Sequence, residues 1–245
     1  MALKDVQKTY EEFGRKDPLY AVLSEKGRSN NRWDVDEFMA TGRKEVADVM
    51  KYASNLGLEL SKGRALDFGC GVGRLTQALC EEFQEAVGVD ISSSMIEIAR
   101  SYNAFGDRCQ YRVNTTDNLT QLDDDIFDFV YSNISLQHSP PEASSKYIAE
   151  FFRVLRSGGV AIFQIPSGPR ARPRSLRSKI YSVKRGPLRR LWKRLRGLPP
   201  VEIHYINRSD VEEIIVESGA RLIDAKQEGS VRGSRVSMLY CAVVS

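Results

Sequence analysis

Three closely spaced glycines between two segments of regular structure constrain this chain more than any other feature. Residues 64–68 have the apolar composition of a β-strand, glycine occupies positions 69, 71 and 73, and residues 74–79 continue with helical spacing. Glycine leaves no Cβ between the main chain and a ligand, and it permits backbone dihedrals that other residues avoid. The pattern therefore predicts a strand, a loop on which a ligand can lie, and a helix.

A second apolar segment ends in a carboxylate. Residues 86–89 are β-type and are followed by Asp90, twenty-one residues after Gly69. Nucleotide-binding α/β folds place an acidic residue at this point, where it binds ribose hydroxyls. The glycine loop and Asp90 together are a much stronger signal for a nucleotide-containing ligand than either is alone.

The spacing of the glycines separates the candidate cofactors. A dinucleotide fingerprint has the order GxGxxG, which would require glycine at position 74, where this chain has Arg74. A phosphate-binding P-loop would require Gly-Lys-Ser/Thr, and none follows. A nicotinamide-dependent oxidoreductase is therefore the less favoured alternative, which a comparison of cofactor binding would decide.

Residues 67–73 resemble the first motif of the class I S-adenosylmethionine-dependent methyltransferases, and residues 89–92 resemble the second. Residues 127–130, 137–138 and 153–159 are similar to the later motifs of that family. The resemblance covers residues 60–165 with specific motifs and 203–245 with weaker ones. It implies an α/β, Rossmann-like fold: a doubly wound seven-stranded sheet in three α/β/α layers, mostly parallel with an antiparallel last strand.

The same resemblance implies S-adenosyl-L-methionine as the cofactor and S-adenosyl-L-homocysteine as its product. The loop is expected to hold the methionine part, Asp90 the ribose, and Ile91 and Met95 the adenine, although core packing accounts for Met95 equally well. Relatives often carry an adenine-binding aspartate where this chain has Thr115, a departure from the common pattern. The complete set of expected cofactor residues is Asp67, Gly69, Cys70, Gly71, Gly73, Asp90, Ile91, Met95, Thr115, Thr116 and Asn133.

His138 follows the fourth predicted strand and is the candidate general base, because a hydroxyl or ammonium acceptor must lose a proton. The alternative role, a histidine that caps or packs the start of the next helix, is somewhat favoured. His204 and Tyr205 are second-rank candidates for the substrate pocket. With only these two histidines and no CxxC pair among four cysteines, neither a metal site nor a disulfide framework is expected.

The segment after the fourth predicted strand narrows the range of chemical groups that could accept the methyl group. It reads Ser132, Asn133, Ile134, and it lacks the Asn/Asp-Pro-Pro-aromatic motif associated with methylation of planar nitrogens. The predicted function is methyl transfer to an oxygen or nitrogen of a small-molecule, sugar-linked or lipid-linked acceptor, with carbon acceptors left open. The alternatives are an RNA methyltransferase, or a membrane- or RNA-binding protein with a degenerate cofactor domain.

Three segments make up the predicted organisation. Residues 1–60 form a helical cover or lid, residues 61–169 with 201–245 form the methyltransferase domain, and residues 170–200 form a basic amphipathic insertion over the active site. Further strands are expected at residues 109–113, 127–131, 160–165, 221–225 and 238–244. Capping boxes that start at Ser139 and Ser209 predict the last two helices.

The insertion belongs to the most basic part of the chain. Residues 151–201 contain fourteen Lys and Arg and no Asp or Glu, so the remainder carries a charge of −10 against the total of +4. Residues 188–195 combine an apolar stripe with a basic face. This pattern fits a helix that packs on the body, a helix at an anionic membrane surface, or a clamp for a phosphorylated or nucleic-acid substrate. A lipid-linked substrate is slightly favoured over RNA, since recognisable RNA-binding motifs are absent.

The N-terminal sequence lacks the apolar core of a signal peptide, and no apolar run approaches the ~18 residues that a membrane span requires. We therefore expect a cytoplasmic protein with reduced thiols. Residues 170–198 could bring it to the inner membrane surface.

Overall fold

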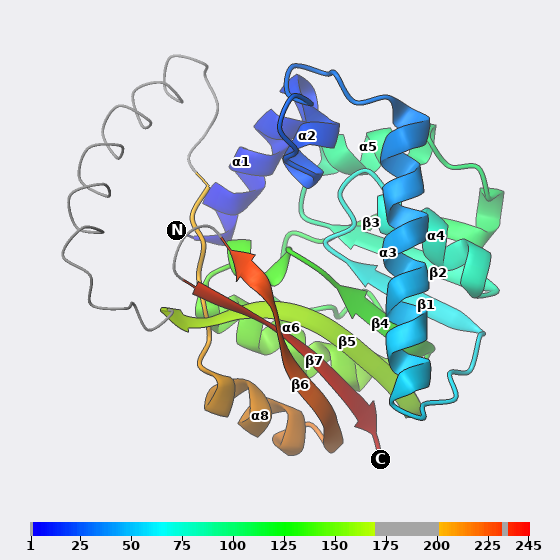
Figure 1. Ribbon diagram of the computed structural model, residues 1–245, viewed down its shortest axis with the longest axis vertical. Coiled ribbons are helices and arrows are strands. Elements are labelled where there is room, and N and C mark those ends of the chain that lie inside the picture. The colour runs from blue at the N-terminus through cyan, green and yellow to red at the C-terminus, as the bar shows by residue number, and fades with distance from the viewer. Residues whose placement is uncertain (1, 170–200, 232–234) are drawn as a thin grey trace.

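The computed structural model describes residues 2–169, 201–231 and 235–245. Seven strands within these residues form one sheet in the order β3-β2-β1-β4-β5-β7-β6 (Figure 1). β1 to β5 pair in parallel, and β7 pairs antiparallel with both β5 and β6, which confirms the predicted mixed sheet. The strands are β1 (Arg64–Phe68), β2 (Glu85–Asp90), β3 (Cys109–Val113), β4 (Phe127–Ser132), β5 (Leu155–Pro169), β6 (Ala220–Val231) and β7 (Arg235–Val244).

Helices cover both faces of the sheet. α3, α4 and α5 pack on one face, and α6 and α8 pack on the other, so the described residues form the predicted three layers (Figure 1). The helices are α1 (Leu3–Lys16), α2 (Pro18–Val22), α3 (Val35–Asn55), α4 (Arg74–Glu82), α5 (Ser93–Ser101), α6 (Pro141–Val154) and α8 (Arg208–Glu217), with short 3-10 turns η1 (Gly106–Arg108) and η2 (Leu136–His138). None of the described helices is long and apolar enough to cross a membrane.

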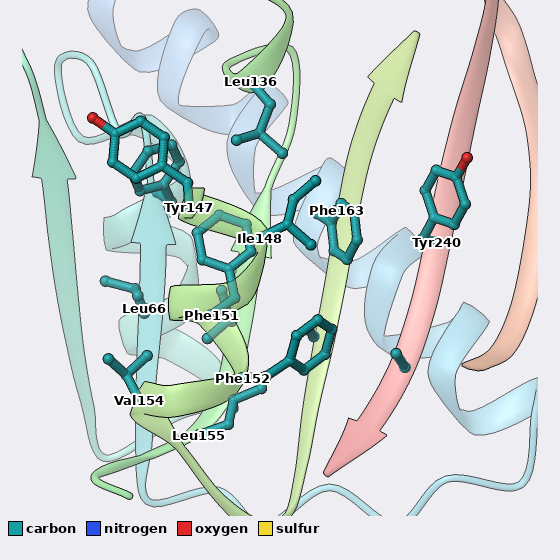
Figure 2. Packing of buried hydrophobic residues seen from close by; sticks show 14 of the residues in the cluster. Leu66, Leu136, Tyr147, Ile148, Phe151, Phe152, Val154, Leu155, Phe163 and Tyr240 are labelled. Carbon is teal, nitrogen blue, oxygen red and sulfur yellow. The ribbon is translucent and has the colours of Figure 1, made fainter. Parts of the chain in front are cut away.

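Aromatic side chains dominate the core under α6 (Figure 2). The ring of Phe151 lies 5.1 Å from Phe68 on β1 and 6.0 Å from Phe163 on β5. Tyr240 on β7 stacks on Phe163 at 5.4 Å, which extends the cluster across the antiparallel edge. Burial of a large apolar side chain contributes about 1.5–3 kcal/mol. This core therefore fixes β1, the strand that leads into the glycine loop.

α3 forms the core of the opposite face. Val46, Val49 and Ala53 are buried against α4 and the sheet, at the helical spacing read from the sequence. The helix starts at a cap that the sequence reading did not identify: the Asp34 carboxylate accepts a hydrogen bond of 3.0 Å from the backbone of Glu37. Such a cap satisfies one of the unpaired donors of the first turn.

The capping box predicted at Ser139 is wrong. α6 begins at Pro141, its N-cap is Pro140, and no side chain caps it. A residue before proline is driven to an extended conformation, and Pro140 adopts one, with ψ 146. The N-cap position therefore falls one residue later than the serine.

The capping box predicted at Ser209 is also wrong. α8 begins at Arg208 with Asn207 as its N-cap, and no side chain caps the helix. Ser209 lies inside the first turn, where its hydroxyl donates to Asp210, and Glu212 pairs with Arg208 at 2.6 Å. Glu212 therefore pairs with Arg208, four residues earlier, and does not form the hydrogen bond that the predicted capping box requires.

The last three strands are longer than predicted. β5 begins at Leu155, five residues before the predicted start at residue 160, and Gly158 within it has a left-handed φ of 76. The register of β5 on β4 shifts at this point, between Phe127 and Phe129. β6 and β7 pair antiparallel at the edge of the sheet, and both extend beyond the predicted residues 221–225 and 238–244. The amphipathic pattern predicted at residues 188–195 lies outside the described residues.

Candidate active site

A cavity lies at the carboxyl ends of β1, β2 and β4, beneath α1 and α2. Open α/β sheets bind ligands in this position, where neighbouring strands leave the sheet to opposite sides. Figure 1 shows α1 and α2 beyond the same ends of these strands. The lining residues are Val6, Tyr10, Ala21, Val22, Phe68, Gly69, Gly71, Val89, Asp90, Ile91, Met95, Asn114, Asn133, Ile134, Ser135, His138, Ser139 and Tyr147.

The glycine loop forms one wall of the cavity. Gly69 and Gly71 line it and have left-handed φ values of 78 and 52. A Cβ at Gly69 would lie 1.8 Å from the Ser135 hydroxyl, and a Cβ at Gly71 would lie 2.6 Å from Cγ2 of Val22. Both positions therefore require glycine, because the segment after β4 and the end of α2 approach the loop backbone directly.

Asp90 ends β2 with its carboxylate at the cavity. Oδ2 accepts a hydrogen bond of 2.9 Å from the backbone N–H of Gly71, and Oδ1 accepts one of 2.9 Å from that of Ser92. Burial raises the pKa of Asp90, and these backbone hydrogen bonds oppose the effect. A carboxylate has about four acceptor positions, so this side chain can still accept hydrogen bonds from ligand hydroxyls.

Asp67 precedes the loop and Cys70 and Gly73 belong to it, but none of the three lines the cavity. The hydroxyl of Thr76 on α4 donates to Asp67 Oδ2 at 2.6 Å, and burial raises the pKa of Asp67 to about 7. Cys70 is buried, and its carbonyl accepts from the backbone N–H of Gly73 at 2.9 Å. These hydrogen bonds stabilise the shape of the loop.

Two of the expected adenine residues line the cavity and two do not. Ile91 and Met95 are in the lining, and Met95 also packs in the apolar cluster beneath α1 and α2. Thr115 and Thr116 are exposed and lie outside the lining. Asn114 lines the cavity instead, and its backbone N–H donates to the carbonyl of Asp90 at 2.8 Å. The position of Asn114 directly after β3 was the sequence feature that could have identified it as a cavity residue.

Asn133 lines the cavity at the end of β4 and contacts a charged residue that the sequence reading missed. Its Nδ2 donates to Glu45 on α3 at 2.7 Å. Glu45 also forms an ion pair of 2.7 Å with Arg74, the residue that excluded the dinucleotide fingerprint. Glu45, Arg74 and Asn133 lie far apart in the chain, so their spacing in the sequence could not reveal that they contact one another.

His138 lines the cavity, with its ring 5.7 Å from that of Tyr10. Nδ1 lies 3.2 Å from the carbonyl of Glu202, which can only accept, so Nδ1 carries a proton. Nε2 then accepts from the side-chain amide of Gln137 at 3.1 Å in the neutral ring. The second-rank candidates His204 and Tyr205 lie outside the lining.

The part of the chain that the structure describes contains no group of three His, Cys, Asp or Glu side chains able to hold a metal ion. All four cysteines are buried and free. The donor set at the cavity is therefore one carboxylate, backbone groups, amides, hydroxyls and a histidine.

Residues 66–163 match the family model described as a methyltransferase domain. The chain is 32% identical over 101 residues to the ubiquinone biosynthesis O-methyltransferase of Alkalilimnicola ehrlichii, with 41% of this chain and 40% of the relative covered. It is 35% identical over 98 residues to phosphoethanolamine N-methyltransferase 2 of Caenorhabditis elegans, with 38% and 22% covered. The chain thus matches less than half the length of these curated relatives.

Solved structures share the whole fold. Magnesium protoporphyrin IX methyltransferase from Synechocystis, with bound S-adenosylhomocysteine, superimposes with a TM-score of 0.62 at 20% identity, covering 99% of both chains. A protein from Pyrococcus horikoshii gives a TM-score of 0.60 at 21% identity, covering 96% of this chain and 99% of its own. The sheet order and the glycine loop define a Rossmann-like methyltransferase fold. Within that fold, residues 66–163 are similar to a methyltransferase domain, and the glycine loop and Asp90 both lie in this segment.

Proposed function

We propose that this protein transfers a methyl group from S-adenosyl-L-methionine to an oxygen or nitrogen of a small-molecule acceptor, including sugar-linked and lipid-linked ones. The observation that carries the proposal is Asp90, a carboxylate with unused acceptor positions at a cavity walled by the glycine loop. The names of the relatives, which include O- and N-methyltransferases of small molecules, support it.

The residues present fit this cofactor. Asp90 would accept hydrogen bonds from the two ribose hydroxyls, Gly69 and Gly71 would pack against the methionine part, and Ile91 and Met95 would contact the adenine. Asn114 would replace the threonines that the sequence suggested. When bound, S-adenosylmethionine supplies an electrophilic methyl group on a sulfonium whose sulfur leaves as a neutral thioether.

The chain's own contribution is then position and proton transfer. A cavity that holds donor and acceptor in line converts a bimolecular encounter into a unimolecular step. His138 is the proposed general base for an acceptor O–H or N–H, through Nε2. Because Gln137 donates to Nε2 at 3.1 Å, the acceptor has to displace that amide before the ring can take a proton.

The division of the chain also stays a proposal. Residues 1–60 would cover the cofactor, which is supported by Val6, Tyr10 and Val22 in the lining. Residues 61–169 and 201–245 would form the catalytic domain, and residues 170–200 a basic insertion over the site. We further propose a cytoplasmic location and a peripheral contact of residues 170–198 with an anionic membrane surface, which the basic composition of that segment supports.

Calorimetric titration with S-adenosylhomocysteine, run beside NAD and NADP, tests the proposal. We expect saturable binding of S-adenosylhomocysteine alone. A labelled-methyl screen of phenols, amines, glycolipids and phosphorylated metabolites would then identify the acceptor. Preference for a dinucleotide, or no binding of S-adenosylhomocysteine, would contradict the proposed function.

A further inference from the structure

Ile134 has a backbone conformation that β-branched residues avoid. Its φ is 60, in the left-handed region, where the branched side chain crowds the backbone. The other non-glycine residues of the described chain with positive φ are Asn30, Asn31 and Asp125, types that tolerate this region. Strained residues of this kind persist where the surroundings fix them, and they cluster at functional sites.

A buried amide holds this conformation in place. Gln164 on β5 is only 2% exposed, and its Oε1 accepts from the backbone N–H of Ile134 at 3.0 Å. Its Nε2 donates to the hydroxyl of Ser237 on β7 at 2.6 Å. Because both ends of the amide are bonded, its orientation is fixed. Ile134 is thus connected to β5 and β7, on the antiparallel side of the sheet.

The strained residue exposes its apolar side chain at the cavity. Ile134 lines the cavity and is 44% exposed. In the sheet, β1 lies between β2, which ends in Asp90, and β4, which precedes Ile134. A cofactor with its ribose on Asp90 and its methionine part on the loop after β1 would present its methyl group toward the end of β4. Ile134 therefore stands on the acceptor side.

Apart from Asp90, the side chains that line the cavity are apolar or neutral. Val6 and Tyr10 of α1 are among them, and Ser135 and Ser139 follow Ile134 in the chain. No Lys or Arg is present among the lining residues that the structure describes. An apolar side chain at such a position gains most from contact with an apolar surface, since that contact removes both from water.

We propose that Ile134 is a specificity-determining residue that packs on an apolar body of the methyl acceptor, and that Gln164 is the positioning residue that holds it there. This inference rests on the proposed function. It names the substrate class as acceptors whose nucleophilic group is attached to an alkyl or aryl body.

Calorimetry of phenol, 4-propylphenol and 4-hexylphenol, titrated into protein saturated with S-adenosylhomocysteine, tests the inference. A fully buried methylene contributes enough for a tightening of about two- to fourfold per added carbon. We expect this dependence in the wild type and a much weaker one in Ile134→Gly, with the affinity for S-adenosylhomocysteine unchanged. An equal dependence in both proteins, or no binding of the alkylphenols to the wild type, would overturn the inference.

Matched variants distinguish the loss of a correctly positioned Ile134 side chain from a general loss of protein stability. Asp125→Gly removes another left-handed side chain, with φ 54, at the opposite end of β4, and it should keep the full dependence on chain length. In Gln164→Glu, the buried carboxyl stays neutral, so it can accept from Ile134 and donate to Ser237, and this variant should retain the dependence on chain length. Gln164→Leu can form neither hydrogen bond and should lose the dependence. If Gln164→Leu is folded and retains it, the positioning role is wrong. Failure of S-adenosylhomocysteine itself to bind would instead count against the proposed function.

Discussion

The side-chain amide of Asn133 donates a hydrogen bond of 2.7 Å to the carboxylate of Glu45, which ties α3 to the carboxyl end of β4. The same carboxylate accepts from the guanidinium of Arg74 at 2.7 Å and from the hydroxyl of Tyr131 at 3.1 Å. The side chain of Arg74 is only 6% exposed. The ion pair between Glu45 and the buried Arg74 thus connects α3, the start of α4 and the cavity.

Removal of the Glu45 carboxylate should destabilise the protein strongly. Glu45→Ala leaves Arg74 buried without its counter-charge, which costs about 3 kcal/mol. Urea denaturation at neutral pH measures the change in the free energy of unfolding. The neighbouring Lys44→Ala removes an exposed ion pair to Asp48 and should change stability by less than about 1 kcal/mol. Equal effects of the two variants would show that the Arg74 pair contributes no more than a surface pair.

Loss of the Asp90 carboxylate should weaken cofactor binding. Asp90→Ala removes charge-assisted hydrogen bonds worth about 1–3 kcal/mol, so the Kd for S-adenosylhomocysteine should rise by about five- to 150-fold. Asp117→Ala is the matched control, because this carboxylate follows β3 but pairs with Lys146 outside the cavity. An unchanged Kd in folded Asp90→Ala would contradict the ribose assignment.

The buried Asp67 should make stability fall as pH rises. Burial raises its pKa from the ordinary 3.8 to about 7, so between these values the folded protein binds the proton more tightly than the unfolded chain does. One pKa unit corresponds to ~1.4 kcal/mol, so the loss across this range amounts to about 4 kcal/mol.

Asp67→Asn keeps the acceptor for Thr76 and cannot ionise. Denaturation of both proteins between pH 4 and 8 should show equal stability at the acid end and a variant that becomes increasingly more stable than the wild type toward pH 8. A difference in stability that does not change with pH would mean that Asp67 is ionised throughout.

Local pattern was sufficient to predict the sheet, the glycine loop and a carboxylate at the end of β2. Arg64 to Asp90 contains the strand, the turn glycines and the carboxylate within one contiguous segment, and the backbone requirement at Gly69 and Gly71 is local. The cap of α5 is local in the same way, since the Ser92 hydroxyl accepts from the backbone of Met95, three residues away.

Side-chain partners distant in sequence could not be read from the chain. Glu45 meets Asn133 across 88 positions, and Gln164 meets Ser237 across 73. The expectation for Thr115 depended on an offset taken from relatives, and both Thr115 and Thr116 are exposed and lie outside the lining of the cavity. The sequence also contains no signal for a left-handed isoleucine at position 134, because its strain is sustained by tertiary contacts.

Glu11 attaches α1 to the start of α5. Its carboxylate on α1 accepts from the backbone N–H groups of Ser93, at 2.5 Å, and Ser94, at 3.2 Å, in the first turn of α5. Burial raises the pKa of Glu11, but the hydrogen bonds from Ser94 and Ser93 outweigh it, and the net pKa is lowered. The contact therefore favours the ionised carboxylate.

Glu11→Gln should loosen α1 in a pH-dependent way. A negative charge at a helix N-terminus contributes about 0.3–1 kcal/mol, so α1 amides should exchange with solvent faster by up to about fivefold at pH 7. Because the folded pKa lies below the ordinary 4.5, this contribution is present above pH 4.5 and disappears as pH falls through the folded value. Glu12→Gln, which breaks an exposed pair with Lys16 on the same helix, should leave the exchange nearly unchanged. Hydrogen exchange of α1 at pH 7 and below pH 4 measures both variants, and identical behaviour of the two would show that the charge of Glu11 does not hold α1 against α5.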